Sequence, residues 1–306
     1  MMEPNYAVEV SGLSKSYKDL VALEKIQFTV DKGELFGLIG PDGAGKTTLF
    51  RILTTLLLPD KGVARVEGWD VVKDYRKIRH ITGYMPGRFS LYMDLTVEEN
   101  LEFFATIFGT TIEENYYLVR DIYQQIEPFK KRLARNLSGG MKQKLALSCA
   151  LIHKPGILIL DEPTTGVDAV SRKEFWEMLI KLKQQGITIL VSTPYMDEAS
   201  LCDRVGLIQN GQLLSIDTPG SIRKAFPKYL YAVKSANVYH LMQDLRGSPQ
   251  MDSVYPFGDY IHVTGMQERI NPQKLSQWLA EKGHEQIEVK QIEPGIEDCF
   301  MDLMNR

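Results

Sequence analysis

The sequence predicts an α/β fold with a largely parallel central sheet, followed by a smaller α+β domain. Segments typical of strands and of helices alternate over the first 220 residues. Several of the strand segments are short and entirely apolar, which is typical of strands covered on both faces. After Pro219–Gly220 the order of elements changes. We therefore expect one domain over residues 1–220 and a second over residues 221–306.

The first domain contains clear strand and helix signals. The predicted strands are Gln27–Val30, Leu35–Ile39, Ile157–Leu160, Ile187–Val191 and Leu207–Gln209. Asn210–Gly211 favours a type I′ turn and so predicts a hairpin at a sheet edge. Gly45–Leu57 is a predicted helix, and Thr96 with Glu99 forms a capping box ahead of a helix over Asn100–Phe108.

The second domain shows a different order of elements. It comprises a strand Lys228–Lys234, a helix from Asn237 to Leu245, strands Asp252–Tyr255 and Tyr260–Thr264, a helix from Asn271–Pro272 to Lys282, and a strand Gln286–Ile292. The resulting βαββαβ order predicts a ferredoxin-like domain.

Composition excludes several classes of function. The chain has 306 residues, 44% of them apolar, a net charge of -3 and a pI near 6.0, so it lacks the basic field that nucleic acid binding demands and no nucleic acid partner is expected. Its three cysteines are widely spaced without a C-x-x-C pair, which supports neither a zinc site nor a disulfide framework and fits a reducing cytosol.

No segment of the sequence is expected to enter a membrane. The N-terminus lacks the basic start and apolar middle of a signal peptide. The apolar runs are much shorter than the roughly 20 residues that a helix needs to cross a bilayer. We therefore expect a cytoplasmic protein.

A phosphate-binding loop is predicted between an apolar strand and a helix, where the sequence reads G-x-x-x-x-G-K-T. Glycines let successive N–H groups curve around an anion, and the helix adds its positive N-terminal end. Lys46 is expected to reach the β- and γ-phosphates, and Thr47 is a candidate Mg²⁺ ligand. An accidental match is the alternative, which the strand-loop-helix context disfavours. The candidate nucleotide-binding residues are Gly40, Pro41, Asp42, Gly43, Ala44, Gly45, Lys46, Thr47 and Thr48.

Two further motifs follow. Ser138 stands at the N-cap position of a predicted helix, and Gly139 and Gly140 let phosphate approach its N–H groups, although an ordinary helix cap is the alternative. A second apolar strand then delivers Asp161 and Glu162 to its carboxyl end. Asp161 is a candidate for holding Mg²⁺, and Glu162 is a candidate catalytic residue that orients or deprotonates the attacking water.

Together these motifs resemble those of ATP-binding-cassette (ABC) proteins, from residue 6 to about 218. Asn136–Gln143 is similar to the family's signature sequence, and Gly166–Asp168 is similar to its D-loop, which makes Asp168 a candidate ATP contact. Tyr17 lies where the family places an aromatic ring against adenine, with a core tyrosine as the alternative.

The resemblance implies a P-loop NTPase cassette with a helical subdomain at about residues 88–155, and an ATPase that uses ATP and Mg²⁺. It also implies that two cassettes meet head to tail. Each ATP then lies between the phosphate loop of one subunit and Ser138–Gly140 of the other. The resemblance leaves open whether the second cassette is another copy of this chain or a different one.

Two positions depart from the family's pattern. Gly87 stands where the family has a glutamine that approaches Mg²⁺, and Pro194 stands where it has a histidine that touches the γ-phosphate. Because a missing donor typically costs on the order of 10²–10³ in rate, we expect slow basal hydrolysis. Either a fully equipped second cassette or neighbours such as Arg88 and Tyr195 could compensate.

A membrane partner is also implied. Arg88–Leu95 is rich in aromatic residues and lies where the family contacts its permease, although packing beneath Asn100–Phe108 is the alternative. Glu293–Phe300 resembles the tail of cassettes that serve ABC-2-type export permeases. The implied location is therefore the inner face of the membrane, reached through the permease. One alternative is an ATP-binding switch that barely hydrolyses ATP. Another is an ABC ATPase that acts on ribosomes or DNA, but the single cassette, the absence of a heptad run and the lack of a basic surface disfavour this class.

Overall fold

The computed structural model describes residues 6–265 and 269–305 and divides into two compact units, Met1–Pro219 and Gly220–Arg306. The main sheet of the first unit has the order β10-β9-β3-β8-β7-β6, and all neighbouring strands are parallel except β9 and β10. Its strands are β3 (Leu35–Ile39), β6 (Thr82–Met85), β7 (Ile157–Asp161), β8 (Thr188–Thr193), β9 (Arg204–Gln209) and β10 (Gln212–Asp217). Every residue of β3, β7 and β8 is buried, which confirms the predicted parallel core.

A second, antiparallel sheet in the same unit has the order β2-β1-β4-β5. Its strands are β1 (Tyr6–Tyr17), β2 (Leu20–Asp31), β4 (Lys61–Val66) and β5 (Trp69–Asp70). Sequence analysis identified only Gln27–Val30 of this sheet. The pairing of β1 with β2 shifts register several times, and each shift interrupts the two-residue alternation from which a half-buried strand is identified.

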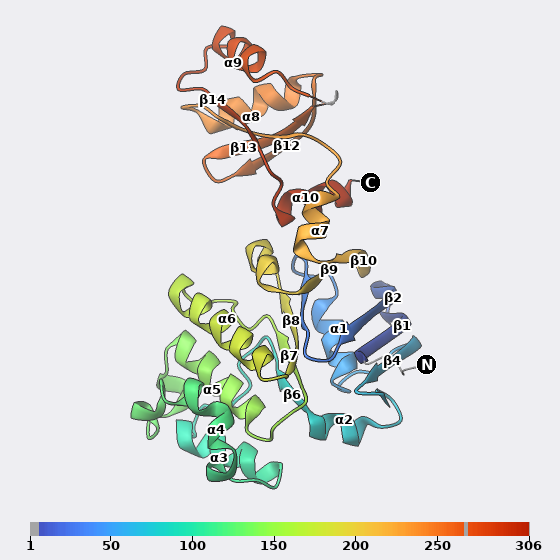
Figure 1. Cartoon of the computed structure of the whole chain (residues 1–306), viewed down its shortest axis with the longest axis vertical. Helices are drawn as coiled ribbons and strands as arrows, with labels where there is room; N and C mark the ends of the chain where they lie inside the picture. Colours follow the sequence, from blue (N-terminus) through green and yellow to red (C-terminus); the bar gives the residue numbers. More distant parts are fainter. Residues whose placement is uncertain (1–5, 266–268, 306) are drawn as a thin grey trace. The chain divides into compact units, whose positions relative to one another are not determined.

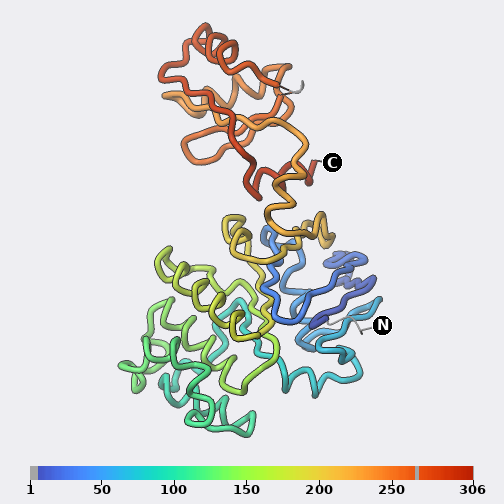
Figure 2. Tube along the Cα trace, viewed as in Figure 1, coloured from blue at the N-terminus to red at the C-terminus, as the bar shows by residue number. Residues whose placement is uncertain are grey.

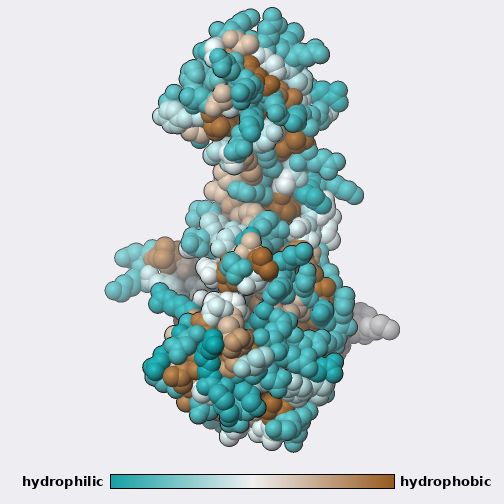
Figure 3. All heavy atoms as spheres, turned by 90° about the vertical axis from the view of Figure 1, so that its left-hand side faces the viewer, coloured by the Kyte–Doolittle hydropathy of each residue, from teal (hydrophilic) through white to brown (hydrophobic). Residues whose placement is uncertain are grey.

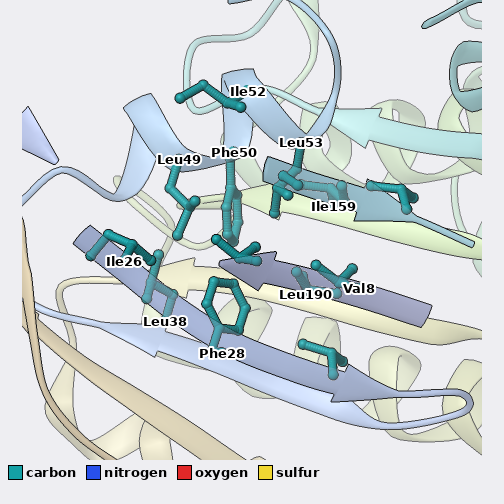
Figure 4. Packing of buried hydrophobic residues seen from close by; sticks show 14 of the residues in the cluster. Val8, Ile26, Phe28, Leu38, Leu49, Phe50, Ile52, Leu53, Ile159 and Leu190 are labelled. Carbon is teal, nitrogen blue, oxygen red and sulfur yellow. The ribbon is translucent and has the colours of Figure 1, made fainter. Parts of the chain in front are cut away.

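The helix α1 (Lys46–Leu53) packs between these sheets. Figure 4 shows Leu49, Phe50 and Leu53 of this helix close to Phe28 of β2 and Ile159 of β7. The helix ends four residues earlier than predicted, and Thr55 beyond it adopts a left-handed conformation with a φ of 62°.

The remaining helices of the first unit lie around the parallel strands. They are α2 (Tyr75–Ile81), α3 (Val97–Ile107), α4 (Ile112–Tyr123), α5 (Gly139–Leu151) and α6 (Ala169–Gln184), with 3₁₀ turns at Glu127–Phe129, Ala134–Asn136 and Met196–Leu201. In Figures 1 and 2, α3, α4 and α5 (green) lie on the opposite side of β6, β7 and β8 from the antiparallel sheet (blue). The predicted capping box of α3 is confirmed, because Thr96 and Glu99 exchange hydrogen bonds in both directions.

The turn between β9 and β10 forms backbone hydrogen bonds both to β2 of the antiparallel sheet and to the loop before α1. Asn210 and Gly211 both have positive φ, 48° and 75°, as a type I′ turn requires. The Gly211 N–H donates to the carbonyl of Ala44 (3.0 Å), and the Gly211 carbonyl accepts from the Glu24 N–H (2.8 Å). A Cβ on Gly45 or Gly211 would lie 2.5 or 2.8 Å from the Ala22 carbonyl oxygen, so these close approaches require glycine. We call this contact of Gly45, Gly211 and Ala22 the glycine seam.

The second unit holds a four-stranded sheet in the order β12-β13-β11-β14, in which every neighbouring pair is antiparallel. Its elements are α7 (Pro219–Lys224), whose first residue ends the first unit, β11 (Leu230–Lys234), α8 (Val238–Gly247), β12 (Met251–Phe257), β13 (Tyr260–Gly265), α9 (Pro272–Glu281), β14 (Glu288–Ile292) and α10 (Ile296–Met304). Asn237 and Asn271 cap α8 and α9 with their side chains, as their positions in the sequence predict. Leu241 and Leu279 from these helices are fully buried against the sheet residue Ile261.

Within residues 6–265 and 269–305, no helix has the length and apolar character needed to traverse a bilayer. The face of the molecule in Figure 3 is mainly hydrophilic, and its hydrophobic residues form separate small groups.

Candidate functional site

The predicted phosphate loop connects the carboxyl end of β3 to α1. Gly43 and Gly45 take positive φ values of 79° and 107°. Gly40 has no room for a side chain, because a Cβ there would lie 2.2 Å from the carbonyl oxygen of Ile208. Gly45 stands at the N-cap of α1 without a side-chain cap, so the first-turn N–H groups of this helix face the loop without a side-chain acceptor.

Lys46 is almost fully buried, with 3% of its surface exposed. Its Nζ donates to the carbonyl oxygens of Gly40 (2.8 Å) and Pro41 (2.9 Å), and it lies 3.1 Å from Oε1 of Glu162. The structure therefore brings together a lysine and a glutamate that are more than a hundred positions apart in the sequence. A phosphate that enters the loop must replace this carboxylate as the partner of the ammonium group.

The two acidic candidates lie at the carboxyl end of β7. Asp161 is buried, and its Oδ1 accepts a hydrogen bond from the Ser192 hydroxyl (2.7 Å). Glu162 has a left-handed φ of 48°, and its N–H donates to the backbone oxygen and the hydroxyl oxygen of Ser192 at 3.1 and 3.0 Å. Residues held in such a conformation cluster at functional sites, since the surroundings must compensate the strain.

Ser192 is a positioning residue that sequence analysis did not single out. It is fully buried on β8, and its one hydroxyl contacts both acidic candidates. A second unrecognised group is Glu198, which is also buried and accepts hydrogen bonds from Thr164 (2.9 Å) and Thr193 (2.5 Å). Serine and threonine at strand ends are common, so only the parallel pairing of β7 with β8 reveals these contacts.

Gly87 and Pro194, the two departures from the family pattern, lie next to these groups. A Cβ on Gly87 would lie 3.1 Å from the carbonyl oxygen of Asp161 and 3.7 Å from its Oδ2, so position 87 directly faces this carboxylate. Pro194 follows β8 and has neither a side-chain donor nor an N–H. Of the two proposed compensating residues, Tyr195 packs its ring against Arg172 (4.7 Å), and Arg88 is exposed.

The other predicted site residues lie at helix starts and a strand end. Ser138 caps α5 through Met141 (3.3 Å), and a Cβ on Gly140 would clash with Ser171 of α6 at 2.7 Å. Asp168 caps α6, and the hydrogen bond from the backbone N–H of Ser171 is the main cause of its lowered pKa.

Tyr17 ends β1 with 42% of its surface exposed, so the core alternative for this residue is wrong.

A cavity of about 380 Å³ lies between β6, the Arg88–Leu95 segment and α5. Leu91 is buried, whereas Tyr92 is half-exposed and packs edge-on against Phe103 (4.7 Å), so the segment both packs on α3 and presents aromatic surface. Three buried polar atoms of the lining residues have no hydrogen-bond partner among residues 6–265 and 269–305: Thr82 Oγ1, Gln143 Oε1 and His153 Nδ1. Burial lowers the pKa of His153 to about 4, which keeps this imidazole neutral.

Comparisons with known proteins place the chain in a family. Residues 23–165 match the model of the ABC transporter family. The chain is 40% identical over 218 residues to the probable multidrug ABC transporter ATP-binding protein YbhF of Escherichia coli (strain K12), which covers 71% of this chain and 38% of that protein. The chain thus spans about two fifths of that relative's length.

Another relative matches nearly the whole length of this chain. The chain is 34% identical to the Nod factor export ATP-binding protein I of Sinorhizobium fredii, over 98% of this chain and 86% of that protein. Among solved structures, an ATP-binding subunit of an ABC transporter superposes with a TM-score of 0.66 at 30% identity, covering 72% of this chain and 93% of that one. A dimeric post-hydrolysis ATP-binding cassette bound to ADP and Pi gives a TM-score of 0.63 at 25% identity, over 69% and 98% of the two chains.

Proposed function

Because this chain belongs to the ABC transporter family, we propose that it binds and hydrolyses ATP to energise export through a separate membrane permease. The observation that carries the proposal is the pairing of Lys46 in the phosphate loop with Glu162 at the end of β7. Two relatives are named for multidrug transport and for Nod factor export, which supports the export direction. The tail over Glu293–Phe300 supports a permease of the ABC-2 type, which would hold the chain at the inner face of the membrane.

ATP binding follows from the residues of the loop. The backbone N–H groups of Gly40 and of Asp42–Thr48 surround the phosphates, Tyr17 stacks on the base, and Lys46 exchanges its carboxylate partner for the γ-phosphate. The released Glu162 carboxylate then accepts a proton from the attacking water. Thr47 and Asp161 offer oxygen ligands of the kind that Mg²⁺ prefers, and they would hold the ion. When bound, Mg²⁺ neutralises charge on the β- and γ-phosphates.

A second cassette completes the site in this proposal. Ser138–Gly140 begins α5, so its N–H groups can bind the γ-phosphate held by another subunit. Asp168 would lie at the same interface. A dimeric relative bound to ADP and Pi supports this arrangement. ATP then stabilises the closed dimer because both subunits contact it only when closed. The partner is either a second copy or a different, fully equipped cassette.

A second candidate function is an ATP-binding switch with very slow turnover. Gly87 and Pro194 favour it, because neither supplies a side-chain donor near Asp161 or the γ-phosphate position. Glu162, which is retained and paired with Lys46, favours hydrolysis.

Lys46→Ala tests nucleotide binding. We expect it to weaken Mg·ATP binding about 10- to 100-fold, since it removes charge-assisted hydrogen bonds to phosphate. It should also abolish ATP-dependent association of the chain with itself or with a sister cassette. Calorimetry and light scattering measure both effects. Lys183→Ala, which removes an exposed pair with Asp203, is the control. An unmodified chain that binds no Mg·ATP would contradict the proposal.

Exchanging Phe89 and Tyr92 for alanine tests permease docking at the Arg88–Leu95 segment, in which Phe89 lines the 380 Å³ cavity and Tyr92 is half-exposed. We expect loss of co-purification with the permease and loss of transport, because aromatic anchors dominate such interfaces. ATP affinity should stay unchanged. Tyr117→Ala on α4, which removes another exposed aromatic ring, is the matched control. Retained permease binding in the double variant would exclude this surface.

A further inference from the structure

His240, Asp244 and His284 come together in the second unit and take no part in the proposed ATP site. One side-chain ligand atom of each lies within 4.8 Å of the others. His240 and Asp244 are one turn apart on α8, and His284 lies in the connection from α9 to β14. Nε2 of His240 is 3.4 Å from Oδ2 of Asp244, and Nε2 of His284 is 3.1 Å from the same oxygen.

Ser235 lies beside the other ring nitrogen of His284. The Ser235 hydroxyl donates to the carbonyl oxygen of Asn237 (3.1 Å), and its oxygen lies 3.4 Å from Nδ1 of His284. In the tautomer whose Nδ1–H donates to this oxygen, Nε2 directs its lone pair toward Oδ2 of Asp244. A cation can then be bound between these two atoms.

Several features favour a metal ion. Ligands bound at about 2.0–2.1 Å in a tetrahedral site lie about 3.4 Å apart, which is close to the two observed separations. A hydrogen bond from Nδ1–H to the Ser235 oxygen, 3.4 Å away, is the kind of outer-shell contact that metal-bound histidines make. The His284 side chain is 1% exposed and thus has a fixed position, whereas that of His240 is half-exposed and free to adjust.

Asp244 is suited to act as a one-oxygen ligand. Lys282 donates to its other oxygen, Oδ1 (3.1 Å). Oδ2 remains directed at the two imidazoles. Lys282 also places a positive charge near the site, which limits the affinity for a cation but leaves Oδ2 accessible.

We propose that His240, Asp244 and His284 bind a divalent metal ion of the zinc class, with water as the fourth ligand. Two imidazoles and a carboxylate suit Zn²⁺ and are softer than the all-oxygen sets that Mg²⁺ prefers. The spacing of the cysteines could not predict this site, because its ligands are two histidines and an aspartate. The ion links α8 to the segment after α9, so its binding stabilises the second unit.

Zinc binding by the full chain tests the proposal. The protein is freed of metal with a chelator and titrated with Zn²⁺ and with Co²⁺ in excess Mg²⁺ and without nucleotide. We expect one Zn²⁺ per chain, a Co²⁺ visible spectrum typical of four-coordination, and a higher melting temperature of the second unit. His240→Ala and Asp244→Asn should each weaken zinc binding by at least about 10- to 100-fold.

Two controls separate a ligand role from a structural one. Tyr239→Ala removes an exposed neighbour of His240 from the same helix, and His80→Ala removes an exposed histidine from the first unit, so both should bind zinc like the unmodified chain. His240 is itself half-exposed, so its replacement leaves the fold intact, as circular dichroism checks. No zinc binding by the unmodified chain, or equal binding by His240→Ala, would overturn the proposal.

Discussion

Replacing Glu162 by glutamine is expected to lower the rate of ATP hydrolysis by about 10²–10⁴-fold while ATP binding is kept. The amide has nearly the same shape as the carboxylate but cannot accept a proton from water. It also no longer pairs with Lys46, which in the structure lies 3.1 Å from Oε1. Incoming phosphate then has no carboxylate to displace, so the dissociation constant for ATP should stay equal or fall. Phosphate release and equilibrium binding measure the two quantities separately.

Glu174→Gln is the matched control for this variant. Glu174 lies on α6 in the same unit and pairs with Lys144 at 2.7 Å. Its replacement removes one carboxylate without changing the nucleotide site, so hydrolysis should be unaffected. If Glu162→Gln hydrolyses ATP as fast as the unmodified chain, then another group accepts the proton and the assignment of Glu162 is wrong.

Pro194→His is expected to raise ATP turnover by as much as about 10²–10³-fold. Position 194 follows β8, the strand that carries Ser192, and proline there offers no hydrogen-bond donor to the γ-phosphate. A histidine would add one donor where charge develops in the transition state. The effect should appear mainly in kcat, measured as phosphate release at saturating Mg·ATP.

Pro194→Ala separates the effect of the added histidine side chain from the effect of losing the proline ring. It adds the same backbone N–H as Pro194→His but no polar side chain, so its turnover should stay low. The double variant Pro194→His, Glu162→Gln should be inactive if the added histidine works through the same site. Equal rates for Pro194→His and Pro194→Ala would mean that a missing donor at this position does not limit hydrolysis. A fully equipped second cassette would then be the better explanation for how this chain functions.

The fold of the first unit could be predicted where hydrophobicity alone determines the element. β3 was predicted with its observed bounds, and β7 and β8 within one or two residues, because each is short, apolar and buried throughout. The order of β11, α8, β12, β13, α9 and β14 in the second unit was also predicted, helped by the asparagine caps of α8 and α9, whereas α7 and α10 were not predicted. The antiparallel sheet was largely missed, since its two long strands are half-exposed and repeatedly bulged.

The site could be predicted only as separate motifs. Local spacing identifies the loop around Lys46 and the acidic pair at Asp161, but the contact of Lys46 with Glu162 depends on how the strands are ordered in the sheet. The roles of Ser192 and of the cluster around His284 depend on which side chains the tertiary fold places at 3 Å, and residue type alone does not reveal this. Burial at Lys46 is likewise a property of the folded loop.

The glycine seam has a consequence for how ATP is received. Since the Ala22 carbonyl lies against Gly45 and Gly211, the hairpin that carries Tyr17 is joined to the phosphate loop by backbone contacts that leave no space to slide. In the proposed site, the distance from the Tyr17 ring, which would stack on the base, to the loop that would hold the phosphates is thereby set before any nucleotide arrives. Such preorganisation means that little chain entropy is lost on binding, and that the adjustments are confined to a few side chains. A substitution of Gly45 or Gly211 that adds a Cβ would push the hairpin away from the phosphate loop. The distance between the base-binding and phosphate-binding groups would then increase, and the site would discriminate less well between nucleotides of different length.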